Sequence, residues 1–178
     1  MIDLYKRSLI HQFHASLSSL DDCVSRCPVE IWKSRVGDFP CWQVAYHTLF
    51  VTDLYLSANE ESFTPPSFHR KNYQFFGRLP WPPHDAVSAD DPFDKETILG
   101  YVQHCRHKTT DVILSETKES LEGPCGFWWY KIPRCEFHLN NLRHIQHHTA
   151  QISLFLRKSA GVEISWAASG FRDQSDDP

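Results

Sequence analysis

Histidines at two places in the chain offer the clearest chemistry in this sequence. His144 and His148 are spaced i, i+4, which puts two imidazoles on one face of a helix, where they can hold an ion between them. With 11 histidines in 178 residues, about 0.7 such pair arises by chance. The spacing therefore carries weight only if the rings also point into the fold.

The apolar pattern around these residues predicts that they do. His148 belongs to the inner face of its helical stretch, and His144 lies close to that face. His47 falls at the centre of an apolar face on another helical stretch. Three inward histidines from two helices are the protein ligands of an open metal site, with one or two positions left for water or substrate. The sequence predicts a metal site at His47, His144 and His148.

Other interpretations of the histidines remain open. Three buried imidazoles, each hydrogen-bonded to a carbonyl or a carboxylate, would give the same pattern without a metal. His144 with His147 is an i, i+3 alternative, although His147 lies at an edge of the helix. His104 and His107 have similar spacing, but we interpret both as surface residues because neither is central to an apolar face.

Polar neighbours of the predicted site are few. We expect Gln151 to accept from a ring N–H of a ligand histidine, and Asn141 to contribute a polar group to the pocket. No inward Asp or Glu stands out as a general base, and Glu116 lies far along its helical stretch. Catalytic residues therefore stay unassigned.

Four long helical stretches must position these residues. Proline and glycine punctuate the chain, and the stretches run from Ile2 to about Cys27, from Pro40 to about Ala58, from an N-cap at Asp91 or Asp94 to near Ser120, and from Pro133 to a C-cap at Gly161. The pattern predicts an all-α four-helix bundle over residues 1–161. Residues 162–178 form a C-terminal tail, expected to fray over its acidic part from Arg172 to Pro178.

The second stretch is apolar nearly all round, so a further element must cover its outer side. A second copy of the chain, in a homodimer, is one candidate. The other is the following connection, residues 59–90, which is rich in proline and too long for a simple turn.

Composition excludes several classes of protein. A net charge of −4 and a pI near 6.2 give no field to attract nucleic acid or anionic lipid. No apolar run is long enough to span a membrane and the start lacks a signal core, so we expect a cytoplasmic protein. The six cysteines contain no C-x-x-C pair, which favours reduced thiols.

Two segments resemble a known family. Residues 40–47 (PCWQVAYH) and 144–152 (HIQHHTAQI) are similar to the DinB/YfiT-like metal-binding four-helix proteins, through a histidine on the second helix and H-x-x-x-H followed by glutamine on the fourth. The resemblance spans about Met1 to Gly161. It implies an up-down-down-up bundle whose second-to-third connection crosses the bundle. It also implies a divalent ion on His47, His144 and His148, commonly zinc or nickel with iron as a further candidate, and often a homodimer.

The resemblance also implies an activity. Relatives include S-transferases and isomerases that use low-molecular-weight thiols, and the iron-binding domain of sulfoxide synthases, whose second domain this chain lacks. We expect an enzyme in which the ion lowers the pKa of a small thiol, or of water, for attack on a small electrophile. The alternative is a non-catalytic stress-response protein that binds a small molecule or a metal.

Overall fold

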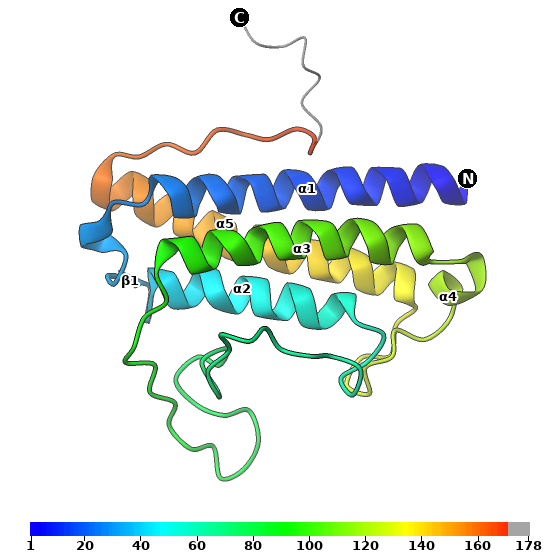
Figure 1. The fold of residues 1–178 in the computed structure, drawn as a ribbon, viewed down its shortest axis with the longest axis horizontal. Helices are drawn as coiled ribbons and strands as arrows, with labels where there is room; N and C mark the ends of the chain where they lie inside the picture. The colour runs from blue at the N-terminus through cyan, green and yellow to red at the C-terminus, as the bar shows by residue number, and fades with distance from the viewer. Residues whose placement is uncertain (171–178) are drawn as a thin grey trace, which may run out of the picture.

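The protein is mostly helical, which confirms the all-α class (Figure 1). The computed structural model describes residues 1–170. Its helices are α1 (Ile2–Arg26), α2 (Cys41–Leu56), α3 (Lys95–Ser115), α4 (Lys118–Glu122) and α5 (Arg134–Ala160). A one-turn 3₁₀ helix (Val29–Ile31) and a hairpin of β1 (Arg35–Val36) and β2 (Phe39–Pro40) link α1 to α2. Across the described residues, no helix combines the length and the apolar character needed to cross a membrane.

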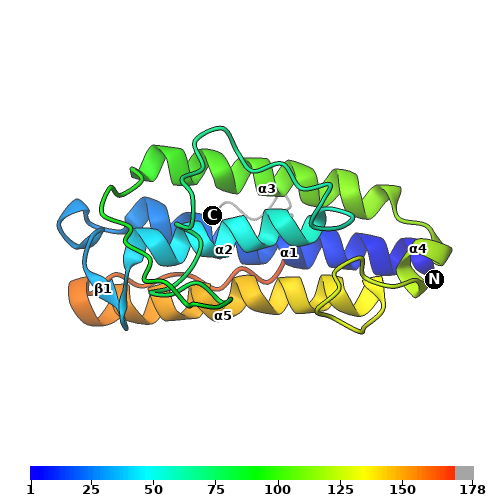
Figure 2. The same cartoon turned by 90° about the horizontal axis from the view of Figure 1, so that it is seen from below.

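Four long helices enclose one core, and each packs against two others. Helix α1 lies against α3 and α5, while α2 also lies against α3 and α5, as Figure 2 shows from below. The core includes large side chains that are fully or almost fully buried: Phe13, Leu17, Trp42, Tyr46, Leu49, Tyr101 and Ile145. All six cysteines are free and five are buried, so they pack as small apolar groups. The contact between α2 and α5 is the one that matters for the predicted site.

The helix ends follow local chemistry. Helix α1 stops just before Pro28, as expected from the missing N–H of proline. Asp94 caps α3 by accepting from the backbone N–H of Thr97 at 2.7 Å. Gly161 ends α5 with a φ of 65°, a left-handed value that favours glycine.

The expected end of the third stretch near Ser120 is wrong. Helix α3 ends at Ser115, and the short α4 follows it. Thr117 and Ser120 form a capping box, in which each side chain bonds the backbone N–H of the other. Because that box satisfies the free N–H groups of a new helix, it starts α4 where the sequence pattern suggested continuation.

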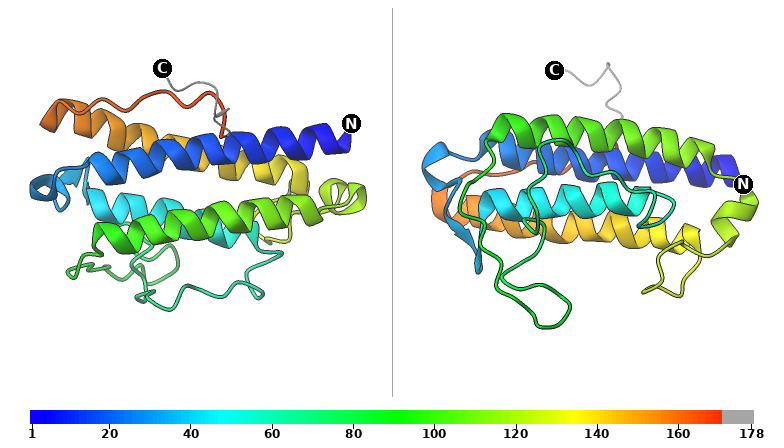
Figure 3. Two further views of the ribbon diagram at one scale, coloured as in Figure 1. Left: turned by 45° about the horizontal axis from the view of Figure 1, so that its top comes forward. Right: turned by 60° about the horizontal axis from the view of Figure 1, so that its bottom comes forward.

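The chain between α2 and α3 covers the outer side of α2. Residues 57–94 contain no helix or strand and run beside α2 on the outside of the bundle (Figures 1 and 3). The Gln43 side chain donates from Nε2 to the carbonyls of Tyr73 and Phe75, at 3.2 and 3.1 Å. Aromatic rings of helix and connection complete the contact: Tyr46, Phe50, Phe63, Phe68 and His69. The chain's own connection thus covers this face, and the homodimer stays a prediction.

The first part of the tail lies along α1 (Figure 1). Val162 and Ile164 pack against the core, and the N–H of Gly170 donates to the His11 carbonyl at 3.0 Å. A Cβ at position 170 would lie 2.1 Å from the Cβ of His14, so the close approach requires glycine. The stretch from Arg172 to Pro178, expected to fray, lies outside the described residues.

Candidate metal centre

Packing of α2 on α5 brings His47, His144 and His148 together. One nitrogen of each ring lies within 4.8 Å of the others, and the trio is the one group of three or more potential metal ligands found within residues 1–170. Nε2 of His47 lies 3.1 Å from Nε2 of His144. A tetrahedral zinc ion holds its nitrogen ligands about 3.3 Å apart, given Zn–N bonds of about 2.0–2.1 Å. The contact between His47 and His144 is close to that spacing, and the cluster of three could hold one ion.

Hydrogen bonds fix which ring nitrogens face one another. Nδ1 of His47 lies 2.6 Å from the carbonyl oxygen of Gln74, and Nδ1 of His148 lies 2.8 Å from Oε1 of Gln151. Since an amide oxygen only accepts, both Nδ1 atoms carry the proton. Each Nε2 atom then has no proton and offers a free lone pair, as metal ligation through Nε2 requires.

Burial keeps the three rings neutral. It lowers the pKa of His47 to about 4, against the opposing effect of the Gln74 carbonyl. It lowers the pKa of His144 to about 3, and repulsion from His47 and His148 adds to the effect. Burial also lowers the pKa of His148. Neutral imidazole is the form that ligates a metal, so at neutral pH the cluster is ready to bind one without losing protons.

An aromatic wall closes one side of the cluster. The Phe76 ring lies 4.2 Å from the ring of His47 and 5.9 Å from that of His148, between centroids. Phe39, on β2, stacks on Phe76 at 4.5 Å. The wall and the Gln74 carbonyl come from the hairpin and the long connection, where no helical or alternating pattern pointed to them. Only their density of aromatic residues was a signal.

The two predicted polar neighbours take different places. Gln151 accepts from His148, and its Nε2 lies 3.3 Å from Nε2 of the exposed His147. Asn141 is fully buried between α5 and α2, where its Nδ2 donates to the Thr52 carbonyl at 3.1 Å. It lies within the contact between α5 and α2.

The alternative histidines lie at the surface. His147, His104 and His107 are all exposed, as predicted for the last two. His104, however, has a buried partner, because its Nε2 lies 3.1 Å from Oδ1 of Asp53.

Asp53 is an inward carboxylate that sequence reasoning missed. Only 1% of the residue is exposed, and it accepts from the Tyr101 hydroxyl at 2.8 Å and from Nζ of Lys108 at 2.6 Å. A charge in the middle of an apolar helix was the available signal, since such a group must be paired. With three side-chain donors around it, Asp53 ties α2 to α3.

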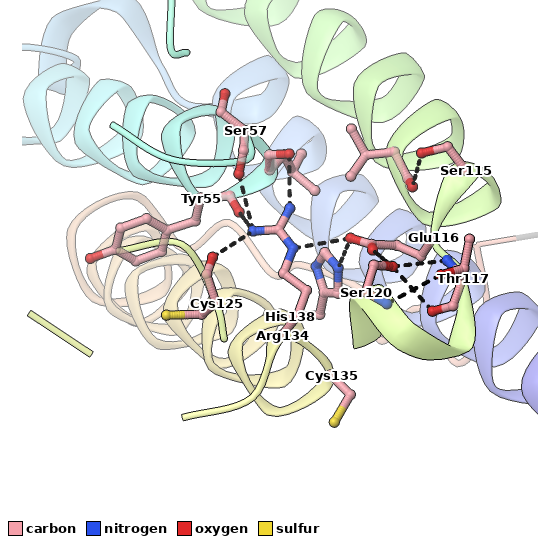
Figure 4. Close-up of polar contacts among 12 residues, drawn as sticks. Tyr55, Ser57, Ser115, Glu116, Thr117, Ser120, Cys125, Arg134, Cys135 and His138 are labelled. Carbon is pink, nitrogen blue, oxygen red and sulfur yellow. Dashed lines mark hydrogen bonds and ion pairs between the residues drawn. The ribbon is translucent and has the colours of Figure 1, made fainter. Parts of the chain in front are cut away.

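A second buried polar cluster lies where α3, α4 and α5 meet (Figure 4). Arg134 caps the end of α2 by donating to the carbonyls of Tyr55, Leu56 and Ser57 at 3.2, 3.1 and 3.0 Å. Its Nε also donates to Oε1 of Glu116 at 3.0 Å, and Nε2 of His138 lies 3.0 Å from the same oxygen. A surface cavity of about 570 Å³ adjoins the cluster.

Glu116 is ionised in that cluster. Burial raises its pKa, but hydrogen bonds from His138, Ser120 and Arg134 outweigh it and lower the pKa to about 2. The sequence pattern placed Glu116 on the inner stripe but gave no sign of its partners, because these lie on other helices. With a charged partner and with both its oxygens accepting, this carboxylate has no free role as a base.

Comparison with family models, with curated proteins and with solved structures found no match to this chain. Membership of the DinB/YfiT-like family therefore stays a prediction, carried by the residues at 40–47 and 144–152.

Proposed function

We propose that this protein binds one divalent ion through Nε2 of His47, His144 and His148. The observation that carries the proposal is the convergence of three neutral imidazoles, two of which have a bare Nε2 fixed by a hydrogen bond at Nδ1. Imidazole nitrogen suits zinc, nickel, iron and copper, and the family resemblance favours zinc or nickel, with iron as a third candidate. The same residues support a DinB/YfiT-like bundle with up-down-down-up order and a proline-rich crossing connection.

The reaction we propose is activation of a low-molecular-weight thiol, or of water, for attack on a small electrophile. Three protein ligands leave at least one position open for a further group. An ion in this site supplies Lewis acidity, which lowers the pKa of a thiol or water that reaches it. Gln74 and Gln151 orient the ligand rings, and Phe76 keeps water from one side of them.

A non-catalytic binding protein is the second candidate. One observation favours it: within residues 1–170, no Asp or Glu joins the histidine cluster. The site then has no carboxylate in place to act as a general base. In this reading the protein holds a metal or a small molecule, as a stress-response protein would, and turns over nothing.

A thiol-transfer assay separates the two candidates. Tag-free protein is loaded with zinc or nickel and mixed with small thiols and a chromogenic aryl halide. We expect thiol-dependent turnover in the wild type. The control variant His107→Ala, which loses an exposed histidine outside the cluster, should show it too. His47→Ala should have none. Turnover in the loaded wild type no higher than in His47→Ala would exclude the thiol transferase and leave activation of water or the non-catalytic binding protein.

The predicted homodimer has its own test. Light scattering of the tag-free protein should give twice the chain mass of 20.7 kDa. A mass equal to one chain would contradict the dimer without touching the metal site.

A further inference from the structure

Among the buried polar atoms on α5 that lack hydrogen-bond partners, two lie one helical turn apart. They are Nδ1 of His144 and Oδ1 of Asn141. Asn141 is fully buried, and its other polar atom, Nδ2, already donates to the Thr52 carbonyl. Since buried polar atoms are ordinarily paired, the two orphan atoms need an explanation.

The proton position on His144 depends on whether an ion is present. Without an ion, Nε2 of His47 is a bare lone pair, so the 3.1 Å contact requires a proton on Nε2 of His144. Nδ1 of His144 is then a second bare acceptor, on a residue three positions after Asn141 in the same helix. Ligation through Nε2 of His144 requires the other tautomer, in which Nδ1 carries the proton. That buried N–H needs an acceptor.

Three side-chain oxygens near the ligand histidines are buried and unpartnered: Oδ1 of Asn141, Oε1 of Gln74 and Oγ1 of Thr149. Nδ1 adjoins Cγ, so it lies on the side of the ring nearest its own helix. Residues i and i−3 share a helix face, with Cβ atoms about 5–6 Å apart, and helical side chains lean toward the N-terminus. Both facts favour Asn141 over Thr149. Gln74 contacts the far side of His47 through its carbonyl.

We infer that Asn141 is a positioning residue for the ion, whose Oδ1 accepts from Nδ1–H of His144 in the ion-loaded protein. The inference rests on the proposed metal site. Binding then pairs two atoms that are unpartnered without the ion, and it fixes the ring of His144 with Nε2 toward the ion. Removing the Oδ1 acceptor should lower the affinity for the ion by about 10–100-fold, which is the usual effect of removing the hydrogen-bond partner of a metal-ligating histidine.

A pair of near-isosteric variants tests this. Asn141→Leu removes the acceptor, whereas Asn141→Asp keeps an oxygen in its place. Zinc affinity, measured by competition with a chromophoric chelator, should fall about 10–100-fold in the Leu variant and stay close to wild type in the Asp variant. Thr149→Val is the matched control that removes another orphan oxygen, and it should bind as the wild type does. Loss in Thr149→Val with none in Asn141→Leu would overturn the assignment.

Nitrogen NMR of histidine-labelled protein gives a readout that a purely structural role would not move. His144 should carry its proton on Nε2 without zinc and on Nδ1 with zinc, and the Nδ1 proton should exchange slowly in the wild type and the Asp variant. If Asn141→Leu does not fold, the wild-type spectra still decide. A zinc-loaded His144 that keeps its proton on Nε2, or exchanges the Nδ1 proton rapidly, overturns the inference.

The two proposals fail in different ways. A wild type that binds no zinc overturns the metal site and this inference together. A wild type that binds zinc beside an Asn141→Leu variant of equal affinity overturns the inference alone.

Discussion

Helix α5 contributes to two polar clusters that contain histidine and that differ in how their polar atoms are paired. In the cluster of Glu116, Arg134 and His138, a carboxylate and a guanidinium satisfy each other and the end of α2, and a single histidine nitrogen, Nδ1 of His138, is left over. In the cluster of His47, His144 and His148, three imidazoles face one another with no charged partner among them. Paired charged groups hold helices together, whereas convergent neutral imidazoles with no charged partner make a candidate ligand site.

Electrostatics separates the clusters in the same way. Hydrogen bonds lower the pKa of Glu116 to about 2, so the first cluster keeps its charge. Burial lowers the pKa of His47 and His144 to about 4 and 3, so the second cluster stays neutral. The contrast predicts that changes in the first cluster alter the free energy of unfolding, and that changes in the second alter metal affinity.

The largest effect is expected from Arg134→Met. It leaves the buried carboxylate of Glu116 without its charged partner, which should lower the free energy of unfolding by about 3–5 kcal/mol. Denaturant unfolding of the ion-free protein measures this. Adding Glu116→Gln should recover part of the loss, because it removes the uncompensated charge. A change below about 1 kcal/mol would place Arg134 among ordinary surface ion pairs.

The complementary change is His144→Ala. Loss of a histidine that binds the ion directly should lower zinc affinity by more than about 100-fold. That figure is the upper end of the effect of removing a hydrogen-bond partner of a ligand. His147→Ala, one turn away and exposed, is the matched control and should bind nearly as the wild type does. Equal zinc affinity in the two variants would abolish the distinction between the clusters.

Acidification should act on His47 and on Glu116 in pH ranges that overlap only slightly. The unfolded chain takes up the proton of His47 near pH 6.5 and the folded, ion-free protein only near 4, so stability falls between these values. For Glu116 the corresponding range runs from about 4.5 down to about 2. The pH dependence of unfolding should therefore flatten below pH 4.5 in Glu116→Gln and between 6.5 and 4 in His47→Phe. A flattening in the opposite ranges would contradict the assigned charge states.

The smallest effect is expected from Gln151→Leu. It removes the acceptor behind His148, but this side chain is exposed, so water can replace the lost bond. Zinc affinity should fall by about 10-fold, the low end for such partners. A loss as large as that of His144→Ala would mean that Gln151 itself contacts the ion.

Features of the fold that depend on residues within one helical turn could be predicted from the sequence. The helix ends at Pro28, Asp94 and Gly161 were predictable because caps and prolines act within one turn. That His144 and His148 share one face of α5 was predictable, because helical spacing sets which residues lie together. The three rings are half-buried, however, and not fully inside the core as predicted. The end of α3 was not predictable, because the capping box of Thr117 and Ser120 lies inside an otherwise continuous pattern.

Contacts between distant segments had no such local signal. Nothing in the sequence paired Asp53 with Lys108, or Glu116 with Arg134, because the partners come from separate helices. The hydrogen bond from His47 to the Gln74 carbonyl could not be predicted either. The connection between α2 and α3 has no periodic pattern that would show which of its residues face α2. The three histidines of the candidate site and the Gln151 partner of His148 could be predicted from the sequence. The Gln74 and Phe76 contacts could only be seen once the chain was folded.

Crystals of tag-free protein grown with zinc test the central claim most directly, with anomalous scattering measured on both sides of the zinc edge. We predict one zinc peak per chain, bonded to Nε2 of His47, His144 and His148 and absent in His47→Ala. A map with no zinc between these three rings, or with zinc bound elsewhere while Nε2 of His144 still bonds Nε2 of His47, would contradict the account.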